Sequence, residues 1–235
     1  MVRLLGGFGV YRNGCPVTLR PSGRRLVALV AVMEETDKRD VAGQLFAELP
    51  AFRAQGNLRT IMWRLSDDFP DLVAEQGGFL HIRAKIDYHE VTKWSLAVVQ
   101  RTTDGFPVPQ QAGKNLLPSW GETWLIEPRE HLHLLQVHAL EACAERFLSA
   151  GRFGEASDCA IRAAALDPLR ESAVKLLIDV LIREGNIAEA LHQYSRFSQL
   201  LFREIHAEPG IALRALVAPL FAAGYATPRG RSHLQ

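Results

Sequence analysis

The sequence predicts a mostly α-helical protein with a small β component, and three observations lead to this fold class. Short apolar runs broken by glycines open the chain, apolar residues then recur at helical spacing, and a repeat of glycine and small residues occupies the second half. The chain has 235 residues, of which 48% are hydrophobic and 23% charged. This is the ordinary composition of a globular protein, so we expect two domains with conventional cores.

The first twenty residues predict a small antiparallel sheet. Residues 3–5 and 8–11 are short apolar runs separated by Gly6 and Gly7. Asn13-Gly14 is a strong hairpin signal before the next run at 17–19, because both residues tolerate a positive φ angle.

Three helices should follow this sheet. Ser22 can cap the first helix, which extends to about residue 33, and Asp37 can cap a second one that ends before Pro50. A third helix is expected over residues 52–69, before Pro70. Its apolar face comprises Ala54, Leu58, Ile61, Met62, Leu65 and Phe69.

A hairpin should close the first domain. Residues 72–75 and 79–82 are its strands, and Gln76, Gly77 and Gly78 form the turn, which we call the hairpin tip. An N-terminal sheet, three helices and a terminal hairpin are the elements of a winged helix-turn-helix. We place this DNA-binding fold at residues 1–88.

The rest of the chain predicts an all-helical second domain over residues 89–226 and an unstructured tail at 227–235. Residues 102–118 are rich in Gly, Pro and Gln and indicate a loop between helices. Gly151-x-x-x-Glu155-Ala156 recurs 34 residues later as Gly185-x-x-x-Glu189-Ala190. This spacing is the tetratricopeptide period, so a tetratricopeptide-like domain is expected.

Long motifs occur in three segments: RAQGNLRTIMWRL at 53–65, LLPSWGETWLIEPREHL at 116–132, and DPLRESAVKLLIDVLIREGNIAEALHQYSRF at 167–197. The chain resembles the SARP family of antibiotic-regulatory transcription activators in these motifs, collinearly over about residues 1–224. That family joins a winged helix-turn-helix to a tetratricopeptide-like bacterial transcriptional activator domain. The resemblance implies a DNA-binding activator of a secondary-metabolite gene cluster, not an enzyme, that binds direct repeats in double-stranded DNA upstream of promoters and contacts the RNA polymerase holoenzyme.

The third helix has the chemistry of a major-groove reader. Arg53, Asn57, Thr60 and Arg64 follow one stripe at about 100° per residue, away from the apolar stripe, and we call them the reading stripe. Arginine can bond guanine with two donors, asparagine can pair with adenine, and the threonine methyl can contact the thymine methyl. A solvated face of an amphipathic helix would show the same pattern without any DNA role.

Other basic residues are placed to contact the DNA backbone. Arg59 lies to one side of the reading stripe, and Arg24 and Arg25 are in the first turn of the first helix, so phosphate contacts are expected for all three. The hairpin tip should lie along the minor groove, with Arg83 and Lys85 near the backbone.

The segment between the second and third helices, residues 47–52, corresponds in related winged-helix activators to the loop that meets the polymerase. Glu48 and Phe52 are the candidates for that contact. The alternative for Phe52 is a core position at the start of the helix.

Two features of the third helix weaken DNA binding by a single protomer. Asp67 lies about 40° from the reading stripe and repels phosphate, and Gly56 costs about 1 kcal/mol of helix propensity. We therefore expect two protomers to occupy adjacent repeats as a homodimer on DNA.

Several other functions are disfavoured. The chain has no phosphate-binding loop motif, its three cysteines show no C-x-x-C spacing, and His131 and His133 cannot share a helix face, so neither a cofactor nor a metal is expected. Trp63, Trp94, Trp120 and Trp124 are expected to pack in the interior, in a core or between domains, rather than to stack on single-stranded nucleic acid. No segment is long and apolar enough to span a membrane and no signal peptide is evident, so a cytoplasmic protein is expected.

The charge distribution leaves one rival function open. Residues 1–64 carry ten Lys or Arg against five acidic residues, but the whole chain has a net charge of only +1. Over residues 1–90 the balance is twelve basic against eleven acidic residues, so the first domain is nearly neutral. Such a domain could bind a protein instead of DNA, and the chain would then be an interaction scaffold built on the tetratricopeptide-like domain.

Overall fold

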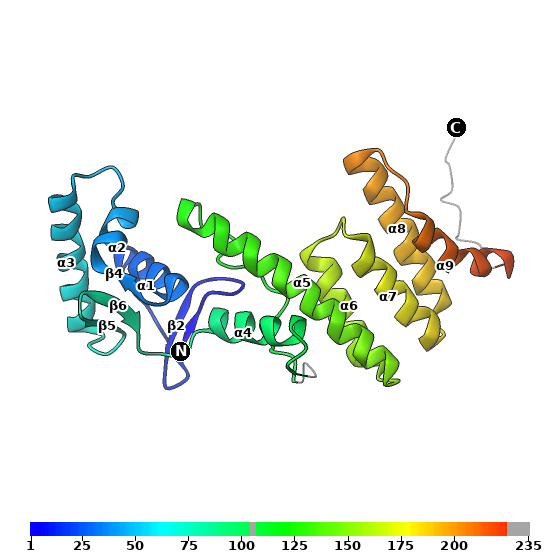
Figure 1. Cartoon of the computed structure of the whole chain (residues 1–235), viewed down its shortest axis with the longest axis horizontal. Helices are drawn as coiled ribbons and strands as arrows, with labels where there is room; N and C mark the ends of the chain where they lie inside the picture. The colour runs from blue at the N-terminus through cyan, green and yellow to red at the C-terminus, as the bar shows by residue number, and fades with distance from the viewer. Residues whose placement is uncertain (104–106, 225–235) are drawn as a thin grey trace. The chain divides into compact units, whose positions relative to one another are not determined.

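The computed structural model describes residues 1–103 and 107–224 and contains mostly helices with small antiparallel sheets, as predicted (Figure 1). Residues 227–235, the predicted tail, lie outside the described residues. Two compact units are present: unit 1 comprises Met1–Lys93 and Lys114–Leu132, and unit 2 comprises Trp94–Gly113 and the chain from His133 onward. Within the described residues, no helix combines the length and apolarity needed to cross a bilayer.

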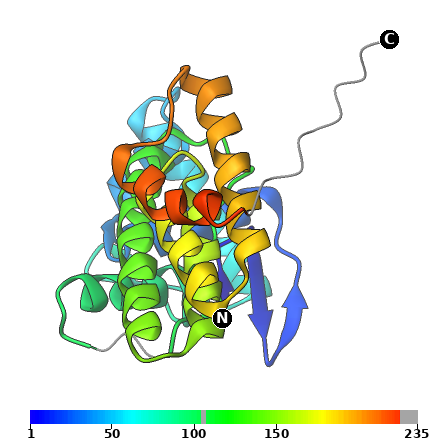
Figure 2. The same ribbon diagram turned by 90° about the vertical axis from the view of Figure 1, so that its right-hand side faces the viewer.

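Unit 1 opens with the predicted antiparallel sheet. Its strands are β1 (Val2–Arg3), β2 (Gly9–Arg12) and β3 (Cys15–Val17), and β2 and β3 lie side by side in Figure 2. Arg12 pairs with Cys15 across a two-residue turn in which Asn13 and Gly14 both have positive φ angles, 51° and 80°. The Asn-Gly hairpin signal is thereby confirmed.

Three helices follow: α1 (Pro21–Met33), α2 (Lys38–Leu45) and α3 (Ala51–Asp68). The predicted Ser22 cap is wrong: Arg20 is the N-cap and α1 starts at Pro21, two residues earlier than predicted, because the fixed φ angle of proline suits the first helical position. The Asp37 cap is confirmed, since its carboxylate accepts a hydrogen bond from the Arg39 amide at 2.6 Å. Helix α2 ends at Leu45, earlier than predicted, because a turn closed by Phe46 and Leu49 precedes Pro50.

The predicted hairpin consists of β5 (Val73–Gln76) and β6 (Phe79–Ile82). The sequence did not predict its third strand, β4 (Thr36–Asp37), which pairs with β6 and ties the start of α2 to the hairpin. Side chains of α1, including Leu26 and Leu29, form a fully buried core together with Leu58 from α3 and Leu80 from β6. This core fixes α3 beside the hairpin.

Unit 1 also contains a segment from far along the chain. The Leu117 amide donates to the Leu4 carbonyl at 2.9 Å, and the Gly6 amide donates to the Asn115 carbonyl at 2.8 Å. Arg129 donates hydrogen bonds to three carbonyls of the same segment, those of Leu116, Leu117 and Trp120. The compact units therefore do not divide the chain at one point near residue 88, because residues 114–132 complete the N-terminal unit.

The remaining helices are α4 (Asp87–Val99), a 3-10 turn η1 (Thr123–Leu125), α5 (Ile126–Ser149), α6 (Phe153–Leu166), α7 (Glu171–Glu184), α8 (Ile187–Ile205) and α9 (Ile211–Ala222). Within unit 2, α7 packs against both α6 and α8. Gly151 and Gly185 precede α6 and α8 with similar φ angles, 71° and 86°, and Ala156 and Ala190 are fully buried. The 34-residue repeat thus occupies equivalent positions in two helical hairpins.

Candidate nucleic-acid interface

Helix α3 separates two kinds of side chain. Its buried face is formed by Ala54, Leu58, Ile61 and Leu65. The four residues of the reading stripe are all exposed, so the fold brings Arg53, Asn57, Thr60 and Arg64 together on one accessible strip. Met62 and Phe69, also expected on the apolar face, are only half-buried.

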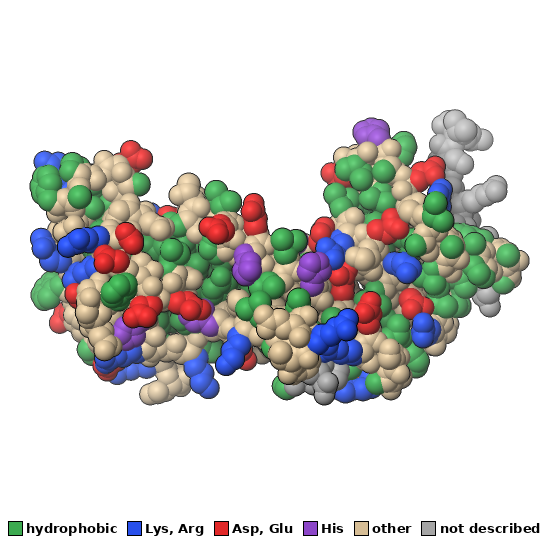
Figure 3. Space-filling model, viewed as in Figure 1, with side chains coloured by type: hydrophobic (Ala, Val, Ile, Leu, Met, Phe, Trp, Pro, Cys, Tyr) green, Lys and Arg blue, Asp and Glu red, His purple; other side chains and the backbone are tan. Residues whose placement is uncertain are grey.

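Local contacts engage Thr60 but leave the arginines of this strip without a carboxylate partner among the described residues. The Thr60 hydroxyl donates to the Gly56 carbonyl at 3.1 Å, and the residue is exposed. The Arg53 guanidinium lies 5.6 Å from the centre of the Phe52 ring. Within residues 1–103 and 107–224, no carboxylate forms an ion pair with Arg53, Arg59 or Arg64. Figure 3 shows basic side chains gathered over α3.

Two aromatic residues of α3, Phe52 and Trp63, are exposed, although a buried position was considered for each from the sequence. Trp63 exposes 68% of its surface, so its expected interior position is wrong. The reason is geometric: Trp63 projects nearly opposite Leu58, Ile61 and Leu65. Phe52 exposes 70%, which excludes the core alternative for this residue, and Glu48 in the preceding loop is also exposed.

The two arginines at the start of α1 already have partners inside unit 1. Arg25 forms two hydrogen bonds with the Glu122 carboxylate, at 2.7 and 2.8 Å, and hydrogen bonding to Arg25 lowers the pKa of Glu122. The Arg24 guanidinium lies 5.2 Å from the Phe8 ring, which stacks on Trp120 at 5.7 Å. Arg25 therefore directs its donors at a carboxylate, whereas Arg24 is exposed.

The hairpin tip is a tight turn. Gln76 pairs with Phe79, and Gly77 and Gly78 have φ angles of 60° and 88°, which glycine adopts without strain. A Cβ atom on either glycine would meet nothing within 4 Å, so the tip is open to a ligand.

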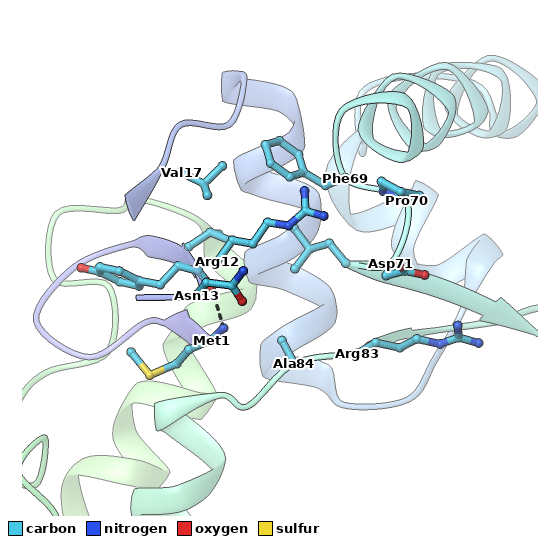
Figure 4. A pocket seen from close by; sticks show the side chains of 12 residues that line it. Met1, Arg12, Asn13, Val17, Phe69, Pro70, Asp71, Arg83 and Ala84 are labelled. Atoms are coloured by element: carbon cyan, nitrogen blue, oxygen red, sulfur yellow. Dashed lines mark hydrogen bonds between the residues drawn. The ribbon is translucent and has the colours of Figure 1, made fainter. Parts of the chain in front are cut away.

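Arg83 and Lys85 are exposed on the chain that leaves the hairpin. Arg83 borders a pocket of about 270 Å³ that is also lined by Arg12, Phe69 and Asp71. In Figure 4 the Arg83 side chain extends away from Arg12. Arg83 is thus accessible from outside the pocket.

Sequence reasoning missed two basic residues near the hairpin tip. Lys38 and Arg39 form the first turn of α2, and both line a pocket of about 340 Å³ together with Arg59, Gly77 and Gly78. The only sequence signal was that both residues directly follow the Asp37 cap, at the start of α2.

Two of the three cysteines are buried. Burial raises the pKa of Cys143 to about 11 and that of Cys159 to about 12, so both thiols stay protonated at neutral pH. No group of three or more His, Cys, Asp or Glu side chains among the described residues could hold a metal ion.

Comparisons with known proteins address both halves of the chain. Residues 111–220 match the family model of the bacterial transcriptional activator domain. The structure is similar to that of Mycobacterium tuberculosis EmbR in complex with a low-affinity phosphopeptide, with a TM-score of 0.63 and 20% sequence identity. The match covers 94% of this chain and 65% of the EmbR chain, so this chain spans about two-thirds of that protein. No curated protein matches the sequence.

Proposed function

We propose that the chain is a sequence-specific DNA-binding transcription activator of the SARP type. One observation carries the proposal: Arg53, Asn57, Thr60 and Arg64 form an exposed strip on a helix whose apolar face is anchored in the core. Such a helix can enter the major groove and present donors to base edges. The activator-domain match over residues 111–220 supports a role in transcription.

The backbone contacts in this proposal come from residues around the reading stripe. Arg24, Arg59, Arg83 and Lys85 are exposed and are assigned to phosphates, and the hairpin tip is assigned to the minor groove. Arg25 is left out, because a phosphate contact would require it to give up two hydrogen bonds to Glu122.

Binding is tested by titrating the full chain against duplexes from promoters near its own gene at several salt concentrations. The logarithm of the affinity should fall linearly with the logarithm of the salt concentration, by about 0.9 per phosphate contact. Affinity that is independent of salt, or equal for promoter and unrelated duplexes, would contradict the proposal. A footprint on the bound promoters should reveal direct repeats.

Glu48 and Phe52 are assigned to the RNA polymerase holoenzyme. Both are exposed and both lie next to the start of α3. The Glu48→Ala variant should bind DNA normally and lower transcription in a purified system. Equal losses of DNA binding and transcription would remove the polymerase assignment.

The remaining parts of the proposal concern assembly and setting. Two protomers bind adjacent repeats as a homodimer on DNA, in the cytoplasm, at the promoters of a secondary-metabolite gene cluster. Asp67 is exposed beside the reading stripe, where its charge repels phosphate and lowers the affinity of one protomer. Nanomolar binding of one protomer to an isolated half-site at physiological salt would refute the dimer.

An interaction scaffold is the second candidate, favoured by exposed apolar side chains on α8 and α9. Phe202, Ile205 and Ile211 expose more than half of their surface. The salt titration separates the two functions, because a scaffold would bind no duplex with the expected salt dependence.

A further inference from the structure

Helix α3 carries a second exposed strip, separate from the reading stripe. Arg59, Trp63 and Ser66 are four and three residues apart and are all exposed. At about 100° per residue, Trp63 lies roughly 90° around the helix from the reading stripe, on the side of Arg59. A large indole exposed beside a guanidinium needs a reason, because tryptophan is on average a highly buried residue.

A groove runs between this strip and the hairpin. One end, about 270 Å³, is lined mainly by apolar side chains that include Met62, Trp63, Phe69 and Val73. The other end, about 340 Å³, is lined by Lys38, Arg39, Arg59 and the glycines of the hairpin tip. Lys38 and Arg59 line both hollows, so the two hollows adjoin, and we call them together the α3–hairpin groove.

The charges in this groove favour an anionic ligand at one end. Two acids line it, and both are engaged: Glu75 pairs with Lys38 at 2.6 Å, and Asp37 caps α2. Arg39 and Arg59 are exposed and form no ion pair with any described residue. An anion can therefore bind both guanidinium groups without displacing a carboxylate.

We propose that the α3–hairpin groove holds the sugar–phosphate backbone of one DNA strand, with a phosphate at Arg39 and Arg59 and a deoxyribose against Trp63. This inference rests on the proposed function. A DNA strand alternates anionic phosphates and less polar sugars. A phosphate suits the cationic end of the groove, and the neighbouring sugar suits its aromatic end. It adds Arg39 and Trp63 to the DNA-contacting residues and gives Trp63 a sequence-independent role.

The test measures affinity for the bound promoter duplex and for an unrelated duplex, over a series of salt concentrations. Arg39→Ala and Arg59→Ala should each lower both affinities alike and reduce the log–log salt slope by about 0.9. Trp63→Ala should lower both affinities on the order of tenfold and leave the slope unchanged, since no charge is lost. Trp63→Phe keeps an aromatic contact and should lose much less.

The controls separate this inference from the proposed function and from misfolding. Trp63 is exposed, so Trp63→Ala should melt at the temperature of the unmodified chain. Arg183→Ala, an exposed arginine of α7, should leave DNA binding unchanged.

Three results would overturn the backbone contact. Trp63→Ala could bind both duplexes normally, or lose affinity for the promoter duplex alone, which would indicate a base contact. It could also lower transcription without changing DNA binding, which would assign the groove to a protein. If Arg64→Ala meanwhile loses sequence discrimination, the proposed function stands and only this inference fails. If the unmodified chain binds no duplex, both fail.

Discussion

Arginines of α3 and arginines of unit 2 differ in what they contact. In unit 2, Arg152, Arg162, Arg170, Arg183, Arg203 and Arg214 each form an ion pair with a nearby carboxylate. Arg53, Arg59 and Arg64 are exposed without such a pair among the described residues. The same side chain is therefore held by a carboxylate of the protein in one region and is left for an outside anion in the other, so net charge alone says little about binding.

The largest expected effect tests whether an unpaired arginine of α3 reads bases. Arg64→Ala should lower discrimination between the promoter duplex and a duplex with a changed base pair by about 1–3 kcal/mol, because one bidentate contact is lost. Its free energy of unfolding should change by less than about 0.5 kcal/mol, since Arg64 is exposed. Competition binding and urea unfolding measure the two quantities. Normal discrimination together with a clear loss of unfolding free energy would contradict the prediction, because Arg64 would then stabilise the fold instead of contacting a base.

The next effect tests a paired arginine. Arg170 forms two hydrogen bonds with the Glu141 carboxylate, at 2.9 and 3.0 Å, and joins the start of α7 to α5. Both side chains are largely buried, so Arg170→Ala should destabilise the chain by about 1.5–3 kcal/mol in urea unfolding. DNA affinity of the folded variant should be unchanged. The Arg170→Ala/Glu141→Gln pair should cost less than the two single changes summed.

A smaller effect concerns the paired arginine of unit 1. Hydrogen bonding to Arg25 lowers the pKa of Glu122 from 4.5, so the ionised pair stabilises the fold above that pH. Glu122→Gln should cost about 1 kcal/mol at pH 7. The difference from the unmodified chain should disappear as the pH falls below 4.5 and through the lowered pKa, which thermal melts at several pH values would follow. A difference that grows on acidification would contradict the assigned cause.

The smallest effect concerns an exposed pair within one helix. Arg183 and Asp179 are one turn apart in α7 and 3.1 Å from each other. Arg183→Ala should cost only about 0.3–0.5 kcal/mol, because water and salt screen such pairs. Raising the salt concentration should reduce even this loss. An effect as large as that of Arg170→Ala would show that burial does not set the value of these pairs.

Local patterns in the sequence predicted most of the fold. The spacing of Ala54, Leu58, Ile61 and Leu65 predicted the buried face of α3, and the paired glycines Gly151 and Gly185 predicted equivalent turns. These features depend on neighbours within one or two helical turns, so they can be read from the chain directly.

Features that depend on distant contacts could not be predicted from the sequence. Arg25 and Glu122 are 97 residues apart, and no local pattern indicates that they meet. The exposure of Trp63 was missed because its residue type suggested a core, although its helical position opposite Leu58 indicated the surface. The strip formed by Arg53, Asn57, Thr60 and Arg64 was predicted correctly as a surface, and its DNA contacts stay a prediction.

The pairing of Leu4 and Gly6 with Leu117 and Asn115 has a consequence for synthesis of the protein. At ~5–20 residues per second, a ribosome needs roughly 5–20 s to travel from the codons for residues 4–6 to those for residues 115–117. During that interval the backbone groups of Leu4 and Gly6 lack these partners. A premature stop before residue 115 should therefore yield a product in which the Leu4 carbonyl and the Gly6 amide lack these partners and unit 1 is incompletely folded.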